Sequence, residues 1–137
     1  MPLLTTKGVY GLIAVLEIAH ASEALPLCIK EISQSYGISK GYLEQILSIL
    51  KEKGIIESKK GKGGGYYLLK SLDEITFYEI YSTLETDFGM TNLEIKDEIL
   101  KKYFKQNDEE IRRLFSKPLS DLVKFKKDST EFLNFVI

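Results

Sequence analysis

The sequence predicts a mainly α-helical fold that carries one small β-hairpin. Two helical segments separated by a short glycine turn are followed by two short extended segments around a glycine-rich tip. In the last third of the chain, apolar residues keep helical spacing over more length than a small domain can cover. We therefore expect a compact domain over residues 1–85 and a helical arm over residues 86–137.

The composition fits one folded domain with an arm. The chain has 137 residues, of which 44% are hydrophobic and 28% charged, and its eight Tyr and seven Phe are enough to fill a core. The single cysteine excludes a disulfide framework or a four-thiolate zinc site within one subunit, and it favours a reducing, cytoplasmic location. The apolar run of residues 9–16 is too short to span a bilayer, so we expect no membrane partner.

Capping residues and apolar spacing predict the first three helices. A threonine at position 5 or 6 can cap a helix to about residue 21, and a second helix fits residues 28–36. Gly37 supplies the turn, since glycine tolerates a positive φ, and Ser39 then caps a helix that runs to residue 53. The apolar positions that define the buried face of this third helix are Leu43, Ile46, Leu47 and Leu50.

The pattern changes from helical to extended after residue 54. Residues 55–59 and 66–69 are short apolar and aromatic segments, and a lysine- and glycine-rich tip joins them, which predicts a hairpin. Residues 76–79 then form a capping box, with threonine first and glutamate last. This box predicts a further helix that ends near residue 84.

The arm contains a second capping box and a proline. Residues 91–94 predict the start of a helix that runs to about Lys105. From Ile111 the apolar positions keep helical spacing across Pro118, which must either kink the helix or lie in its first turn with Ser116 as the cap. The apolar positions Leu114, Phe115, Leu119, Leu122 and Val123 exceed what the small domain can cover, so we expect them to be buried by packing between two subunits. The apolar tail, residues 132–137, is expected to dock on another surface such as a partner subunit.

Charge is unevenly distributed, although the formal net charge is only −1. Residues 1–70 hold nine lysines and six acidic residues, a net charge of +3, whereas residues 71–137 hold ten basic and fourteen acidic residues, a net charge of −4. Lys59, Lys60 and Lys62 converge on the glycine-rich tip. A charge run is most often a solvated surface, but a basic tip beside two helices joined by a tight turn suits an approach to phosphates.

Helix, turn, helix and hairpin in this order form a winged helix-turn-helix, which favours double-stranded DNA as the partner. The N-terminal side chains of the second of these helices reach base edges, where Gln45 can pair with adenine and Glu44 with the cytosine amine. The expected DNA-binding residues are Ser39, Lys40, Tyr42, Glu44 and Gln45 of the recognition helix, Lys59, Lys60, Gly61, Lys62 and Gly63 of the wing, and Thr6 and Lys7 at the start of the first helix.

Three separated motifs stand in one order along the chain. They are Leu4-Thr5-Thr6-Lys7-Gly8, then Gly37-Ile38-Ser39 followed by Tyr42-Leu43-Glu44-Gln45, then Gly61-x-Gly63-Gly64-Gly65-Tyr66. In this order and spacing they resemble the Rrf2 family of bacterial transcription regulators, the IscR/NsrR/CymR type, over roughly residues 1–85. The resemblance implies a homodimer in which a long C-terminal helix packs across the two subunits and which binds a pseudo-palindromic operator.

The sequence departs from the family pattern in two places. Sensing members carry three cysteines in the loop before the dimerisation helix, and these ligate an iron–sulfur cluster, whereas residues 86–103 here contain none. We therefore expect no cofactor. Val9 stands where the family usually has Arg, and Lys60 and Lys62 stand where Arg and Pro are common, which leaves the operator sequence open.

Cys28 has two interpretations. At the start of the second helix it can fill a small niche in place of a serine-like cap. Alternatively, a helix N-terminus favours the reactive thiolate form, which would make the thiol a redox switch beside the DNA-binding unit.

No catalytic constellation is present, so we expect a protein that is not an enzyme. The chain has one His and one Cys, and His20 lacks the spacing of a metal site and fits the end of the first helix instead. Four aromatic residues are interpreted as core, with a ligand pocket as the alternative: Phe77, Tyr78, Tyr81 and Phe88.

The sequence thus predicts a cytoplasmic, homodimeric, DNA-binding transcription regulator, most simply a repressor, without an iron–sulfur cluster. The rival interpretation is a protein-interaction module on a winged-helix scaffold, in which the acidic arm grips a partner protein. A regulatory protein or a small-molecule effector is a further expected partner.

Overall fold

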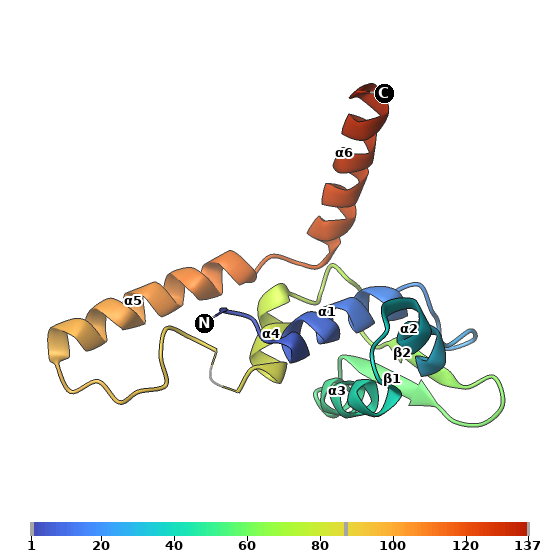
Figure 1. Ribbon diagram of the computed structural model, residues 1–137, viewed down its shortest axis with the longest axis horizontal. Helices are drawn as coiled ribbons and strands as arrows, with labels where there is room; N and C mark the ends of the chain where they lie inside the picture. The colour runs from blue at the N-terminus through green and yellow to red at the C-terminus, as the bar shows by residue number, and fades with distance from the viewer. Residues whose placement is uncertain (1, 87, 137) are drawn as a thin grey trace.

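The computed structural model describes residues 2–86 and 88–136, with side chains as far as Ser129. In this part of the chain the elements are α1 (Thr6–Ile18), α2 (Ile29–Tyr36), α3 (Lys40–Glu52), β1 (Ile56–Lys59), β2 (Gly65–Leu68), α4 (Phe77–Leu84), α5 (Glu98–Phe115) and α6 (Ser120–Val136). Figure 1 shows α1 to α4 and the hairpin gathered in one head, from which α5 and α6 extend in different directions as an arm. The expected fold, mainly helical with one antiparallel hairpin and a long C-terminal helical region, is confirmed.

Helices α1, α3 and α4 enclose an aliphatic core. The caps expected from the sequence are present: the Thr5 side chain accepts a hydrogen bond from the Gly8 N–H, and the Ser39 side chain accepts one from the Tyr42 N–H. Helix α1 ends at Ile18, short of the expected residue 21, because residues 19–21 form tight turns instead. The fully buried side chains include Val15, Ile18, Leu43, Ile46, Leu47, Leu50, Ile55, Ile75 and Ile80.

The turn between α2 and α3 depends on the backbone conformation of Gly37 and on the buried side chain of Ile38. Gly37 ends α2 in the left-handed region with φ of 66°, as expected. The Ser33 hydroxyl donates a hydrogen bond to the Ile38 carbonyl (2.6 Å), and Ile38 is only 3% exposed. This hydrogen bond and the buried Ile38 side chain therefore fix the orientation of α3 relative to α2.

The expected hairpin forms, with β1 and β2 paired antiparallel. Ile56 pairs with Leu68 and Lys59 pairs with Gly65 across the two antiparallel strands. A further bridge joins Leu27 to Tyr66, which ties β2 to the segment before α2. Gly65 is required there, because a Cβ at this position would lie 2.4 Å from the Leu27 carbonyl oxygen.

The prediction that a helix begins near Leu93 is wrong. The Thr91 hydroxyl accepts a hydrogen bond from the Leu93 N–H within a turn, and α5 begins five residues later, after Asp97, whose side chain caps it. The Met90 N–H donates to the Asp108 carboxylate (2.7 Å), which folds the preceding segment back along α5. Tertiary contact therefore overrides the local capping signal.

Neither expectation for Pro118 is correct. The residue lies between two separate helices and forms a bridge with Thr76, and Ser116 belongs to the end of α5, where its hydroxyl donates to the Arg112 carbonyl (2.5 Å). The Leu119 N–H then donates to the Ile75 carbonyl (2.8 Å). The junction of the arm is thus held against the segment before α4.

The expected dimer residues do not share one surface. Leu119 is fully buried in the core of its own chain, and Phe115 packs against that core, so Leu119 is not available to a partner. Leu114 and Val123 are exposed on the arm, and Leu122 is half-buried. The apolar tail of residues 132–137 lies outside the residues whose side chains are described.

Candidate nucleic-acid interface

The start of α3 presents a polar face to solvent. Its apolar face is fully buried, so the side chains of Lys40, Glu44 and Gln45 on the opposite face are exposed. Tyr42 is half-buried, and its ring meets Tyr10 of α1 edge-on at 5.9 Å between centroids. The structure therefore directs three of the expected base-reading and phosphate-binding residues outward and holds the fourth, Tyr42, against α1.

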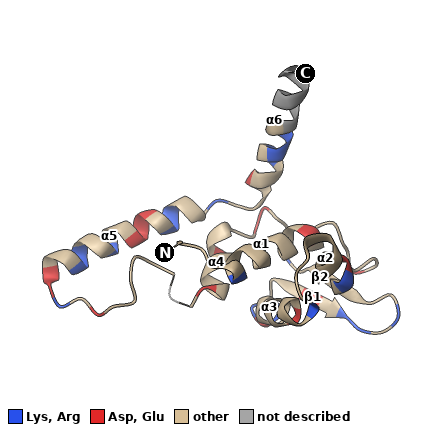
Figure 2. Cartoon of the chain, viewed as in Figure 1, with Lys and Arg blue, Asp and Glu red and all other residues tan. Residues whose placement is uncertain are grey.

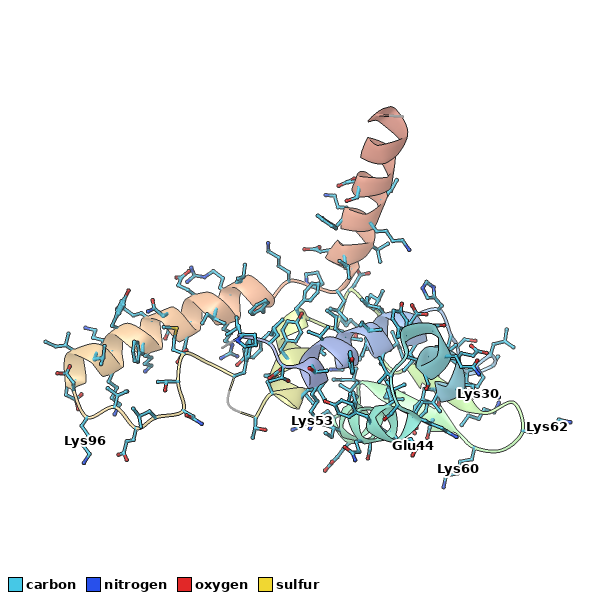
Figure 3. All side chains as sticks on the ribbon, in the orientation of Figure 1. Lys30, Glu44, Lys53, Lys60, Lys62 and Lys96 are labelled. Atoms are coloured by element: carbon cyan, nitrogen blue, oxygen red, sulfur yellow. The ribbon has the colours of Figure 1, made fainter. Side chains whose placement is uncertain are left out.

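The wing extends its lysines away from the head. Lys59, Lys60 and Lys62 are exposed, and Figure 3 shows Lys60 and Lys62 directed away from the body of the domain. Gly61 and Gly63 have φ of 92° and 76°, and nothing crowds either position, so their backbone conformation alone requires glycine. Figure 2 shows the loop between β1 and β2 as a basic tip beside α3.

Lys51 ties the recognition helix to the wing, a contact that the sequence analysis did not identify. Its ammonium donates to the Ser58 hydroxyl (2.6 Å) and lies 3.3 Å from the Glu57 carboxylate. A hydrogen bond from the Ser58 N–H, followed by the contact with Lys51, lowers the pKa of Glu57. Sequence spacing alone does not reveal this triad, because the strand residues meet α3 only through the tight turn at residues 53–55.

Cys28 lies in a hollow between α2, α3 and the wing. The thiol is exposed and makes no capping hydrogen bond to α2. The hollow has a volume of about 430 Å³, and Lys51, Lys59 and Lys60 are among its lining residues. The structure therefore brings the thiol together with three lysines, two of which were expected to bind DNA.

The start of α1 adds a third part to this surface. Thr6 is exposed and Lys7 is half-buried in the first turn of the helix. The contact between Tyr10 and Tyr42 places this end of α1 next to the start of α3. The residues expected at the phosphate backbone and in the groove thus belong to neighbouring elements of one head.

The aromatic residues of α4 and Phe88 pack where the arm meets the head. Tyr81 is buried and contacts Phe88 and Phe115 with ring centroids 6.0 and 5.2 Å apart. Burial, followed by the nearby Glu85 carboxylate, raises the pKa of Tyr81, so this side chain stays neutral. The guanidinium of Arg112 lies 5.1 Å from the centre of the Tyr78 ring. Tyr81 is thus part of the core and Phe77 and Phe88 pack against it, whereas Tyr78 and Phe88 also line a hollow of about 280 Å³, so both interpretations of this cluster stay open.

Comparison with known proteins identifies a family for most of the chain. The family described as "Rrf2: Iron-dependent Transcriptional regulator" matches residues 4–124. The HTH-type transcriptional regulator IscR of Escherichia coli (O1:K1 / APEC) is 40% identical over 93 residues, which are 68% of this chain and 57% of the relative. The match therefore spans little more than half the length of that relative.

Solved structures share the fold over nearly the whole chain. A transcriptional regulator from Listeria innocua has a TM-score of 0.76 at 32% identity, covering 88% of this chain and 85% of its own. CymR, the global cysteine regulator of B. subtilis, has a TM-score of 0.76 at 31% identity, covering 91% and 98%. IscR of T. potens has a TM-score of 0.75 at 27% identity, covering 92% and 89%.

The family description names iron, but the residues present here do not fit a cysteine-ligated iron cluster. Cys28 is the only cysteine in the sequence, and it lies at the start of α2, whereas the loop before α5 contains neither cysteine nor histidine. Among the described residues no group of three or more His, Cys, Asp or Glu side chains is arranged to hold a metal ion. The contact between the arm and the head is formed by aromatic side chains, in which the Phe115 ring packs against Tyr81 and Phe88.

The extent of these matches decides the class of protein. The family match covers more than half of the chain, and its members are transcription regulators, so the expectation of a protein that is not an enzyme is confirmed. Within the described residues, no helix is both long and apolar enough to cross a membrane. The capped α3, the wing and the family match lead to one conclusion: the chain belongs to the Rrf2 family of DNA-binding helix-turn-helix transcriptional regulators.

Proposed function

We propose that this protein is a homodimeric repressor that binds a pseudo-palindromic operator and needs no iron–sulfur cluster. The observation that carries the proposal is the exposed polar start of α3 beside a basic wing tip. A helix N-terminus with side chains free to reach base edges suits a major groove, and a flexible basic tip suits the adjacent minor groove. Occupation of a promoter by such a dimer blocks transcription.

Each part of the head has its own role in this proposal. Glu44 and Gln45 read base edges, while Lys40 holds a phosphate and Tyr42 holds a phosphate or stacks. Lys59, Lys60 and Lys62 bring charge to the minor groove, where Gly61 and Gly63 allow the close approach of the backbone. Ser39 supports the recognition helix by capping it, and Thr6 and Lys7 bind a phosphate at the start of α1.

Exposed apolar residues on the arm support a dimer. Ile99 is 84% exposed and Phe125 is 67% exposed, although both are large hydrophobic side chains. Tyr103 and Leu114 share the outer side of α5 with Ile99, and Val123 lies on α6. A second copy that covers these surfaces removes them from water, and a two-fold dimer places two recognition helices about one turn of DNA apart. Leu114, Leu122 and Val123 stay in the proposed contact, and Leu119 is left out of it.

The division between a DNA-binding domain of residues 1–85 and a regulatory arm of residues 86–137 belongs to the same proposal. Residues 115–119 of the arm pack on the head, so a signal received by the arm has a direct route to the domain that binds DNA. The acidic arm suits a regulatory protein or a small-molecule effector. DNA is the target, so the cytoplasm of a bacterial cell is the proposed place of action.

Cys28 adds a second control point to the proposal. The exposed thiol shares its hollow with Lys59 and Lys60, so an added oxygen or a mixed disulfide would alter the surface from which the wing approaches DNA. Structural filling of a niche is the alternative role of this residue.

A selection from a random DNA pool tests the proposed function directly. The purified protein should enrich a two-fold symmetric sequence, and it should migrate as a dimer at the concentrations used for binding. Gel-shift titrations at two salt concentrations should then show a preference for the enriched site at both. Enrichment of no sequence at either salt concentration would favour the protein-interaction module over the regulator.

Variants of the wing and of the recognition helix should lose binding in different ways. Replacement of both Lys60 and Lys62 by Ala should weaken binding to every sequence and lower the salt slope by about 1 for each lost phosphate contact. Glu44→Ala should instead reduce the discrimination between bases at one position of the operator, and the lost discrimination should be about 1–3 kcal/mol. Uniform loss on all sequences for both variants would contradict this division of roles.

The redox role is tested by oxidant titration of the selected complex. Wild-type protein treated with peroxide or an oxidised thiol should release DNA, because modification of Cys28 crowds the wing. Cys28→Ser protein should bind DNA with the same affinity before and after treatment. If the wild-type protein binds equally well before and after oxidation, Cys28 has only a structural role.

A further inference from the structure

A buried carboxylate joins the end of α4 to the start of α1. The Glu85 side chain is 8% exposed, and its Oε1 atom accepts hydrogen bonds from the Thr5 N–H (2.7 Å) and the Thr5 hydroxyl (2.8 Å). Thr5 is the N-cap of α1, so the carboxylate lies at the positive end of the helix dipole. Among the described residues no lysine or arginine pairs with Glu85. The first turn of α1 is therefore the principal partner of this charge.

Two glycines on α1 make room for this contact. A Cβ at Gly8 would lie 2.2 Å from Oε1 of Glu85, and a Cβ at Gly11 would lie 2.0 Å from Cδ1 of Leu84. Both glycines lie inside the helix, where glycine is a poor choice for stability, and neither has a positive φ. Close approach of the end of α4, and not backbone conformation, explains both residues.

The turn of α1 that Glu85 holds also carries the proposed phosphate contact. Lys7 follows the Thr5 cap by two residues, and Tyr10, one turn further along, packs on Tyr42 at the start of α3. Glu85 itself is the C-cap of α4 and stands directly before residue 86, where the arm begins. The carboxylate thus lies between the entry to the arm and the phosphate-binding turn.

We propose that Glu85 is a positioning residue for DNA binding, and that its carboxylate fixes the first turn of α1 so that Lys7 reaches a phosphate. The proposal rests on the phosphate contact assigned to Lys7 under the proposed function. Glu85 touches no base or phosphate itself and acts only through α1.

A double-mutant cycle on the full chain and its selected operator tests this proposal. Lys7→Ala should weaken binding about tenfold and lower the salt slope by about 0.9, which corresponds to one lost phosphate contact. Glu85→Ala should produce the same loss, and the double variant should bind no more weakly than either single variant. Glu85→Ala combined with Lys60→Ala should multiply the two losses, because Lys60 is exposed at the wing tip and forms no hydrogen bond or ion pair with the described residues of α1.

Three further variants separate positioning from general destabilisation. Glu85→Gln keeps an oxygen that can accept from Thr5, so it should restore most of the affinity and the salt slope. Glu79→Gln removes a charge from the same helix, where it pairs with Lys70 (2.7 Å), and should leave the salt slope unchanged. Gly8→Ala keeps the charge but forces the carboxylate away from Thr5, so it should reproduce the loss of Glu85→Ala if the latter variant does not fold.

The possible outcomes distinguish this inference from the proposed function. If Lys7→Ala weakens binding but the losses of Glu85→Ala and Lys7→Ala multiply, Glu85 does not act through Lys7 and the inference is wrong. If Lys7→Ala leaves the affinity and the salt slope unchanged, the phosphate contact assigned to Lys7 fails and the inference fails with it. Selection of a symmetric operator by the wild-type protein would still stand in both cases.

Discussion

The buried face of α3 is the constraint on which the rest of the head depends. Leu43, Ile46, Leu47 and Leu50 are all fully buried, and burial of one such side chain contributes about 1.5–3 kcal/mol. A rotation of α3 by one residue would expose part of this face, so the rotation of the helix is fixed by several kcal/mol. The same rotation directs Lys40, Glu44 and Gln45 to solvent. In the proposed function, the core therefore decides which side chains can meet DNA.

The other elements of the head hold this arrangement from different sides. Helices α1 and α4 cover the buried face, and the capped turn of α1 is held by Glu85. Lys51 links α3 to the wing, so the basic tip keeps its place relative to the recognition helix. Leu119, a residue of the arm, completes the core with its fully buried side chain. The proposed DNA-binding surface is thus supported by contacts that lie outside it.

Local signals in the sequence predicted the head well. The caps at Thr5, Ser39 and Thr76 and the turn at Gly37 depend on neighbours within a few residues, and all four form as expected. The hairpin also depends on a local change of period and a glycine-rich tip. The exposed recognition residues followed from the same helical spacing, because an apolar face fixes the opposite polar face.

The errors lie where distant segments meet. The capping box at Thr91 was overridden by the contact between Met90 and Asp108, and the role of Pro118 depends on a bridge to Thr76. Leu119 was expected to lie in the dimer contact because the core residues that enclose it, and Ile75 to which its N–H donates, lie far away in the sequence. The Lys51 and Glu85 contacts were missed for the same reason, although glycine at position 8, inside a helical pattern, was a signal of close packing.

Hydroxyl-radical footprinting of the selected operator tests the central claim that a dimer presents two rigid heads to DNA. The account predicts two equivalent regions of backbone protection related by two-fold symmetry, about one helical turn apart, each flanked by minor-groove protection from the wing. Protection of a single region, or protection that does not depend on the sequence of the site, would contradict it.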